Sequence, residues 1–341
     1  SSARLFQPKV FSSRPITTFM HAMILAAGFG TRLWPLTIDR TKPAIPVLNR
    51  PLVAYAVEYL REAGIQEMVV NLHHQGESVS EALGDGSQFG CRIQYSDEAD
   101  QILGTSGALD HARHLLEHGP FVVMNGKVIT NIDLRPAIDL HVSQKALATL
   151  VLRPNTSRER FSRVEVDDRG WVTRFAGFPA PNDGIEEPLM FTGIQILDPA
   201  IFEFIPRGVF SHSTTDVYPQ AMAQGLPVVG YVSRNPHEYW YEFSTLRRYL
   251  DLSLHLHHQS TVIGEDCQID PSAYITDSVI WKQVQIGPGS RIHRAIIGDN
   301  VVLPAESNLE QVVVVRADKL SPEELEKHQA HIFHDNLVVE F

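Results

Sequence analysis

The pattern of apolar and polar positions alternates between strand-like and helix-like segments over most of the chain. An apolar run at 22–27 is followed by a helical pattern at 53–63 and a second apolar run at 67–71, which predicts a βαβ unit. Further short apolar runs, separated by helical stretches such as 107–118, lie at 92–95, 121–124, 148–152, 193–197 and 228–232. This alternation predicts an α/β fold with a largely parallel, doubly wound sheet.

A regular six-residue spacing of isoleucines replaces this pattern after about residue 259. Isoleucines stand six positions apart at 263, 269 and 275, and after an interruption the same step resumes at 286 and 292. An apolar residue at every sixth position is typical of a β-helix, in which short strands wind around a triangular coil. Because each coil buries its faces only on its neighbours, the end of such a solenoid needs a cap. The serine and proline that open the segment 321–328 predict a helix that could serve as one.

These patterns predict three parts of the chain. They are an extension at 1–19, an α/β domain at 20–256, and a β-helix with a helical tail at 257–341. A chain of 341 residues is long enough for two domains, because single cores usually stop growing at about 250–300 residues. The extension has basic and no acidic side chains but lacks a continuous apolar segment, which disfavours a secretory signal. A transit peptide is the alternative interpretation.

Charge and composition restrict the partners and the compartment. A formal net charge of −11 disfavours nucleic acid as a partner, because binding to its backbone needs an extended basic surface. No apolar run reaches the roughly 20 residues that cross a bilayer, so we expect no membrane partner. Cys91 and Cys267 are far apart in sequence and form no CxxC pair, which favours free thiols in a reducing cytoplasm over a disulfide or a zinc site.

The loop after the first apolar run carries the most specific chemistry. Gly28 and Gly30 allow backbone amides to approach a phosphate chain that a β-carbon would obstruct. Arg32 adds a bidentate donor and Lys42 adds a point charge, so two cations could converge on one anionic ligand. Two glycines after a strand can also make a simple turn, and a bare GxG would not decide between the two interpretations.

A longer run of residues around these glycines favours the phosphate interpretation. The chain reads G-x-G-T-R-L-x-P-L-T at 28–37, then K-P at 42–43 and P-V-x-x-x-P-L at 46–52. This run resembles the signature of the sugar-1-phosphate nucleotidylyltransferases, also called NDP-sugar pyrophosphorylases, and within them the mannose-1-phosphate guanylyltransferase-like branch. The resemblance covers about residues 22–310. It implies a Rossmann-like nucleotidyltransferase domain followed by a short left-handed β-helix of hexapeptide repeats.

The resemblance also implies a reaction and a set of site residues. In that family a sugar 1-phosphate attacks the α-phosphorus of an NTP and pyrophosphate leaves, so catalysis consists of positioning and charge neutralisation. Arg32 and Lys42 would be the catalytic residues. The nucleotide would be bound by Leu25, Ala26, Ala27, Gly28, Gly30, Thr31, Arg32, Leu103, Gly104, Thr105 and Asn125, with Gly104 allowing close approach of the base. The sugar would be bound by Gly126, Thr192 and Gly193, with GTP and mannose 1-phosphate slightly preferred.

The chain departs from the family pattern at its metal ligands. The family has an aspartate after Asn-Gly at the end of a strand, and this position is occupied by Lys127. An ammonium group cannot coordinate Mg²⁺, which takes oxygen ligands. The second family aspartate corresponds to Glu242, which keeps a carboxylate, and Asp133 is a conceivable replacement for the first. Binding of the Mg²⁺ that the family uses is therefore in doubt. The sugar-side Glu-Lys-Pro motif corresponds to Gly177-Phe178-Pro179, so the lysine of that motif is missing.

Three functions stay open at this point. The first is nucleotidyl transfer impaired by Lys127, with an NTP and a sugar 1-phosphate as partners. The second is a catalytically silent subunit that binds nucleotide or sugar nucleotide for regulation. The third is acyl transfer on the β-helix, with His293 as the candidate base, although a short β-helix better suits a platform for homo-oligomer formation.

Overall fold

The computed structural model describes residues 20–98, 101–179, 184–328 and 332–341. The predicted extension at 1–19 lies outside these residues. The chain forms two compact units, and unit 2 contains residues 20–28 and 53–241. Unit 1 contains residues 29–52 together with 242–341, so the segment after the first strand is grouped with the C-terminal part. The boundary between 256 and 257 stays a prediction.

A nine-stranded sheet forms the centre of unit 2 in the part of the chain that the structure describes. Along most of the sheet the strand order is β10-β9-β11-β6-β1-β4-β5, and β8 adds to β11 and β12 to β8. Strands β1, β4, β5 and β6 are mutually parallel, as predicted, whereas β11 is antiparallel to its neighbours. The strands span β1 His21–Leu25, β4 Glu67–Leu72, β5 Arg92–Asp97, β6 Phe121–Asn125, β8 Ala148–Pro154, β9 Arg163–Val166, β10 Val172–Ala176, β11 Leu189–Leu197 and β12 Val228–Val232.

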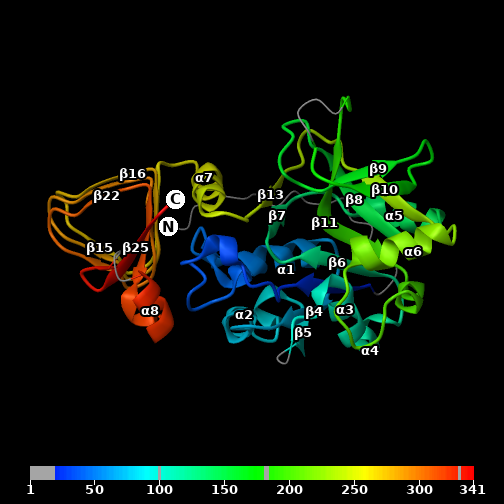
Figure 1. Cartoon of the computed structure of the whole chain (residues 1–341), viewed down its shortest axis with the longest axis horizontal. Coiled ribbons are helices and arrows are strands. Elements are labelled where there is room, and N and C mark those ends of the chain that lie inside the picture. The colour runs from blue at the N-terminus through cyan, green and yellow to red at the C-terminus, as the bar shows by residue number, and fades with distance from the viewer. Residues whose placement is uncertain (1–19, 99–100, 180–183, 329–331) are drawn as a thin grey trace. The chain divides into compact units, whose positions relative to one another are not determined.

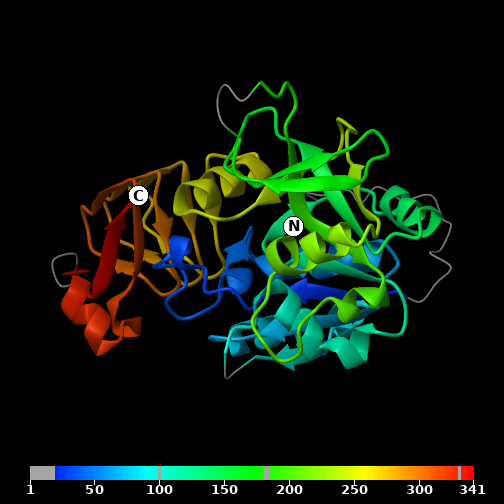
Figure 2. The same cartoon turned by 45° about the vertical axis from the view of Figure 1, so that its right-hand side comes forward.

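Helices cover both faces of this sheet (Figures 1 and 2). Neighbouring residues of a strand point to opposite faces, so a strand that is apolar throughout needs a helix on each side. Met23 and Val123 point to the face that packs with residues of α3, α4 and α6. Ile24 points to the other face, near Val53 of α1. No helix in the described part of the chain is long and apolar enough to span a membrane. The helices of this unit are α1 Leu52–Glu62, α2 Glu77–Leu83, α3 Gly104–His111, α4 Arg113–Leu116, α5 Arg135–Ser143 and α6 Tyr218–Ala223.

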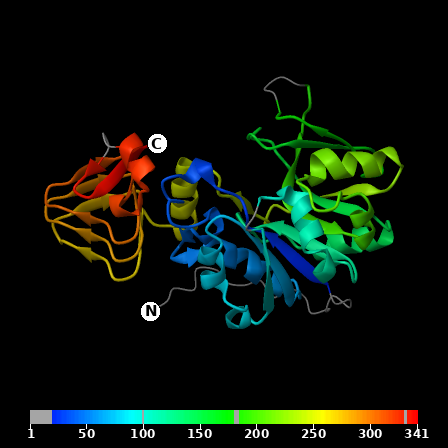
Figure 3. The ribbon, with the colours of Figure 1, turned by 60° about the horizontal axis from the view of Figure 1, so that its bottom comes forward.

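Parallel coils of a β-helix form most of unit 1, and Figure 3 shows them stacked from yellow to orange. Ile269 pairs with Ile286, and Ile275 pairs with Ile292, so one coil takes 17 residues rather than 18. The break in the six-residue spacing therefore recurs once in every coil, because one of its three corners is a residue shorter. The three sheets are β14 Thr261–Ile263, β17 Ser278–Ile280, β20 Ile296–Ile297 and β23 Val312–Arg316; β15 Gln268–Ile269, β18 Gln285–Ile286 and β21 Val302–Leu303; and β16 Tyr274–Thr276, β19 Arg291–His293 and β22 Asn308–Glu310.

The end of the β-helix has more structure than the sequence predicted. The helix predicted at 321–328 is present as α8 Pro322–His328, and Ser321 and Glu324 cap it by exchanging backbone-to-side-chain hydrogen bonds. Beyond it, β24 Ile332–Phe333 and β25 Asn336–Glu340 form a hairpin, and β25 pairs antiparallel with β23. This pairing covers an edge that a parallel coil would otherwise leave open. At the other end, α7 Leu246–His257 packs against β14 and β17.

Candidate functional site

The carboxyl ends of β1 and its neighbours form the edge of unit 2 where the sequence predicts a ligand. β1 lies between β4 and β6, so the order of the strands reverses on either side of it. Open α/β sheets bind ligands at such a switch point, outside the carboxyl ends of the strands. Ala26 to Gly28 follow β1 here, and Gly126 and Lys127 follow β6. The fold therefore places these predicted residues at one edge of the sheet.

Two buried polar side chains connect the loops at this edge. The Asn71 side chain accepts a hydrogen bond from the Ala26 amide at 2.7 Å and donates one to Glu98 at 2.7 Å. The other carboxylate oxygen of Glu98 accepts from the Leu103 amide at 3.0 Å. Asn71 and Glu98 are each only 3% exposed. Neither residue was predicted from the sequence, although a polar side chain at the end of an apolar strand was the available signal.

The glycines of the predicted site differ in what surrounds them. A β-carbon at Gly28 would meet no atom within 4 Å, so the space above this residue is open. A β-carbon at Gly104 would lie 2.5 Å from the carbonyl oxygen of Ser211, and one at Gly193 would collide with the Asn125 amide. Both residues also have positive φ angles, 74° and 79°. The protein's own packing therefore requires glycine at 104 and 193, whereas Gly28 leaves room for a ligand.

The segment 211–213 satisfies the first amides of α3. The Thr105 amide donates to Nδ1 of His212 at 3.3 Å, and the Ser106 amide donates to the carbonyl of Ser211 at 3.0 Å. These acceptors replace the missing intrahelical partners of a helix start, so α3 begins at Gly104, earlier than the predicted stretch at 107–118. The predicted close approach at Gly104 is made by Ser211. A contact of Leu103, Gly104 or Thr105 with the base stays a prediction.

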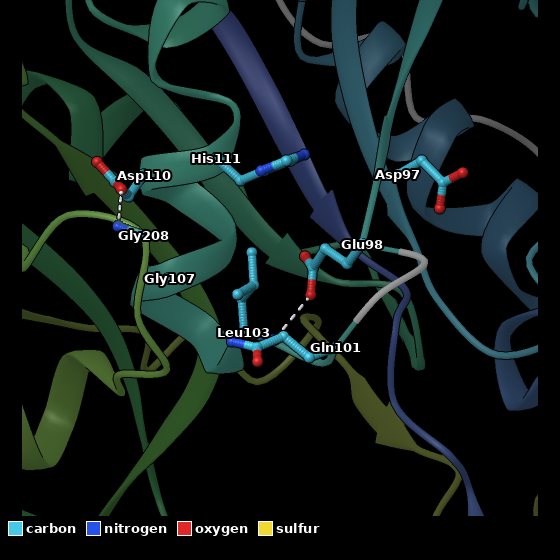
Figure 4. Close-up of a pocket in the computed structure, with 8 residues that line it drawn as sticks. All are labelled: Asp97, Glu98, Gln101, Leu103, Gly107, Asp110, His111 and Gly208. Carbon is cyan, nitrogen blue, oxygen red and sulfur yellow. Dashed lines mark hydrogen bonds between the residues drawn. The ribbon is translucent and has the colours of Figure 1, made fainter.

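A pocket of about 350 Å³ opens beside this helix (Figure 4). Its polar groups are mainly acceptors, because Asp97, Glu98 and Asp110 contribute carboxylates. Asp110 is engaged by Arg113 at 2.8 Å and by the Gly208 amide at 2.8 Å. Such a pocket suits a ligand with hydrogen-bond donors. The complete lining is Asp97, Glu98, Gln101, Leu103, Gly107, Asp110, His111 and Gly208.

Thr192, one of the predicted sugar-binding residues, contacts a buried tryptophan. Thr192 is 1% exposed, and its hydroxyl donates to the carbonyl of Val151 at 2.7 Å. The indole N–H of Trp240 donates to the Thr192 carbonyl at 2.9 Å, and Phe161 packs edge-on against the indole ring. The side chain of Thr192 is therefore used by the fold. Sugar binding by Thr192, Gly193 or Gly126 stays a prediction.

The residues considered for a metal ion are Glu242, with Lys127 at the other expected position, and Asp133 as a conceivable replacement. In the part of the chain that the structure describes, no group of three histidine, cysteine or acidic side chains could hold a metal. Asp133, the conceivable replacement ligand, is held by Arg135 at 2.6 Å. Burial opposes ionisation of Asp133, but the hydrogen bonds and charge of Arg135 dominate and lower the pKa of its carboxyl group. With Lys127 after β6, unit 2 does not fit the two-carboxylate Mg²⁺ site that the family resemblance implies.

The two predicted catalytic cations of unit 1 are in different surroundings. Arg32 is exposed on the short helical turn that follows Gly30. Lys42 is buried, and its ammonium group lies 3.9 Å from the carboxylate of Glu242, which is also buried. Glu242 thus balances the charge of Lys42. A β-carbon at Gly30 would lie 2.7 Å from the β-carbon of Lys42, so the glycine permits this close packing.

His293, the candidate base for acyl transfer, is part of the β-helix packing. Its Nδ1 atom lies 2.9 Å from the hydroxyl of Thr276 on the preceding coil and 3.7 Å from the carboxylate of Asp277. The ring thus bonds to the neighbouring coil. The geometry does not favour acyl transfer over a structural role for this histidine.

The sequence matches two protein-family models. Residues 21–259 match the model described as nucleotidyl transferase, and residues 256–312 match a GlmU-like C-terminal hexapeptide model. Together with the parallel sheets, these matches confirm the predicted Rossmann-like domain followed by a left-handed β-helix of hexapeptide repeats.

Curated relatives of the chain act on different sugar phosphates. A UTP–glucose-1-phosphate uridylyltransferase from Synechocystis is 33% identical over 61% of this chain, but the alignment spans only 56% of that relative. A mannose-1-phosphate guanylyltransferase from Mycobacterium tuberculosis is 28% identical over 85% of this chain and 83% of its own length. A solved Bacillus anthracis structure, assigned as a glucose-1-phosphate thymidylyltransferase, covers 69% of this chain and 95% of its own with a TM-score of 0.59. At 24% identity, this last likeness supports the fold alone.

Proposed function

Because the chain belongs to the nucleotidyl transferase family, we propose that it transfers a nucleotidyl group from an NTP to a sugar 1-phosphate. A phosphate oxygen of the sugar 1-phosphate forms a bond to the α-phosphorus of the NTP. The bond from that phosphorus to the bridging oxygen breaks, and pyrophosphate leaves. The observation that carries this proposal is the signature at 28–37, whose first glycine leaves open space at the end of β1.

The roles of the site residues follow from their surroundings. The backbone from Leu25 to Gly28 would approach the triphosphate, because Gly28 leaves room there for phosphate oxygens. Arg32 is exposed and would bind the triphosphate through its guanidinium group. Lys42 would lie beside the reacting phosphates, with Glu242 fixing its position in the absence of ligand. Gly30 and Thr31 complete this loop.

We propose guanine as the preferred base because of the pocket beside α3. The Watson–Crick edge of guanine carries an N1–H and an amino group, both donors, whereas uracil offers one donor between two acceptors. The carboxylate of Asp97 and the amide of Gln101 could accept from such an edge. Asp97→Ala is expected to lower the preference for GTP over UTP by about tenfold. Asp168→Ala, which removes an exposed carboxylate from a turn outside the pocket, is the control and should leave the preference unchanged.

Lys127 favours one alternative to an active enzyme, a catalytically silent subunit. A single ammonium group supplies one charge where the family places a divalent ion with inner-sphere ligands, so turnover would be slow. The alternative is a silent subunit that binds nucleotide or sugar nucleotide for regulation. Binding of Mg²⁺ by this chain stays an expectation from the family resemblance.

Pyrophosphate release separates the enzyme from the silent subunit. The assay compares four NTPs with several sugar 1-phosphates, on the unmodified chain and on Lys127→Asp. An impaired enzyme would be supported if the unmodified chain releases pyrophosphate and Lys127→Asp releases it faster in the presence of Mg²⁺. Nucleotide binding without release in either protein would support the silent subunit. Absence of any nucleotide binding would contradict both.

We also propose that the chain forms a homo-oligomer through its β-helix and resides in the cytoplasm. The hexapeptide match supports the first proposal, and the two cysteines, which form no disulfide, accord with the second. Light scattering of the full chain would measure its mass in solution. A monomer at all accessible concentrations would contradict the oligomer.

A further inference from the structure

The segment 29–52, which carries Arg32 and Lys42, is attached to the β-helix within unit 1. The attachment begins at Arg40, one residue before the buried Thr41-Lys42 pair. The guanidinium group of Arg40 donates to the carboxylate of Asp299 at 2.7 Å and to that of Asp39 at 2.9 Å. It also lies 5.0 Å from the ring centre of Trp281, in the geometry of a cation–π contact. Both Asp299 and Trp281 belong to coils of the β-helix.

This cluster is buried enough for its geometry to matter. The side chain of Asp299 is 4% exposed and that of Arg40 is 18% exposed. The second carboxylate oxygen of Asp299 accepts from the Lys282 amide at 3.2 Å, so the β-helix backbone also orients this carboxylate. Removing one member of such a buried pair leaves the other charge uncompensated. The buried carboxylate of Asp299 therefore holds Arg40 against the coils.

Neighbouring charges reinforce the attachment. Lys319, beyond the last coil, pairs with Asp39. Burial opposes ionisation of Asp39, but hydrogen bonds and charges from Arg40 and Lys319 dominate and hold its pKa at about 2. Burial likewise opposes the charge of Arg40, and the two aspartates overcome it and raise its pKa. Asp39 and Arg40 are thus both ionised at neutral pH. Arg40 binds Asp299 in the coils, and Asp39 binds Lys319 beyond the last coil.

A second attachment lies on the other side of Lys42. The hydroxyl of the buried Tyr249, on α7, donates to the carbonyl of Pro46. The indole of Trp281 donates to the same hydroxyl at 2.9 Å, so Trp281 takes part in both attachments. The side-chain amide of Asn49 donates to the carbonyl of Ile263 on β14 at 3.3 Å. The segment is therefore fixed before and after Lys42.

We propose that the β-helix positions the phosphate-binding segment, with Arg40 as the positioning residue that connects them. Loops that bind phosphate must be held in place for their cations to act, and a small displacement of such groups costs much of their effect. Here the support comes from the hexapeptide coils, which gives these coils a task in nucleotide binding besides oligomer formation. This inference rests on the proposed function for the meaning of the segment, but the attachment can be measured without turnover.

The test compares Arg40→Met with a matched control. Arg294→Met removes an ion pair of similar length, 2.8 Å to Asp251, which joins the β-helix to α7 without touching segment 29–52. Hydrogen exchange would be followed on peptides covering 29–50, and GTP affinity would be measured by calorimetry on the full chain. Arg40→Met is expected to speed exchange of these peptides and to weaken GTP binding about tenfold, while exchange of the β-helix core stays slow. The control should change neither quantity.

A milder variant keeps the test decisive if Arg40→Met does not fold. Lys319→Met removes only the outer partner of Asp39, and a smaller increase of exchange at 29–50 is expected. Unchanged exchange and unchanged GTP affinity in a folded Arg40→Met protein, or unchanged exchange in Lys319→Met, would overturn the inference. If the unmodified chain binds no GTP, the proposed function fails, and the exchange result alone then decides whether the β-helix holds the segment.

Discussion

The sheet edge of unit 2 and the coils of unit 1 use polar residues in opposite ways. At the sheet edge, Asn71 and Glu98 are buried and connect loops that are far apart in sequence. In the β-helix, apolar side chains of one coil stack on those of the next, and most polar side chains point outwards. The coils thus depend on repetition of one contact, whereas the edge depends on a few specific hydrogen bonds. Stability should therefore respond to volume in the coils and to hydrogen bonding at the edge.

The largest effect on stability is expected from the coils. Ile297 is fully buried in the β-helix core, so Ile297→Ala should lower the free energy of unfolding by about 4 kcal/mol through lost burial and a residual cavity. Chemical denaturation would measure the change, and hydrogen exchange would locate it in the coils. A loss under about 1 kcal/mol would contradict close packing in this core.

A somewhat smaller loss is expected at the sheet edge. Glu98→Ala leaves the Asn71 amide and the Leu103 N–H without their carboxylate, which should cost about 3 kcal/mol. Glu98→Gln keeps an acceptor and should cost less. Equal stability of the two variants, measured by denaturation, would show that hydrogen bonding is not what holds this edge.

The two glycines of the predicted nucleotide site give a sharper contrast. Gly104→Ala forces a β-carbon against Ser211 at a positive φ angle and should cost about 2 kcal/mol. Gly28→Ala should change stability by less than about 0.5 kcal/mol but weaken nucleotide binding, because the new methyl group enters the open space. Thermal melts and calorimetric titration with GTP would test both. Unaltered GTP affinity in Gly28→Ala would remove this glycine from the phosphate site.

A small effect is expected from acid. The pKa of Asp39 is about 2 in the folded chain, below its unfolded value of about 3.9, so its stabilising contribution is complete above about pH 4. That contribution is lost as the pH falls towards 2, and solvent screening limits it to about 1 kcal/mol. Comparison of Asp39→Asn with the unmodified chain at pH 5 and pH 2.5 would test this. A difference in stability that does not shrink at the lower pH would contradict the assignment.

The sequence predicted the coils better than the edge, for a physical reason. In a β-helix each residue packs on the equivalent residue one coil away. The repeated contact therefore requires a repeated sequence, which is visible as the regular spacing of the isoleucines. The one-residue shortening at a corner explains the interruption of that spacing. The C-terminal hairpin was missed because β25 pairs antiparallel with β23 and follows no repeat.

At the sheet edge, the predicted loop after β1 was found from its glycines and cations, which have a local signature. The partners of that edge have only a weak one, a polar side chain at the end of an apolar strand. Asn71, Glu98 and the segment 211–213 act through residues between 5 and 108 positions away, and no local pattern identifies these partners. The sequence therefore indicates where a ligand could bind, and the structure shows which groups hold the loops there.

The central claim is that the segment with Gly28 and Arg32 binds a nucleoside triphosphate. Calorimetric titration of GTP into the unmodified chain and into Arg32→Ala tests it most directly, because Arg32 is exposed and its removal should leave the fold intact. We predict saturable binding to the unmodified chain and binding at least about tenfold weaker to a folded Arg32→Ala protein. Equal affinity in the two proteins, or no binding of any NTP to the unmodified chain, would contradict it.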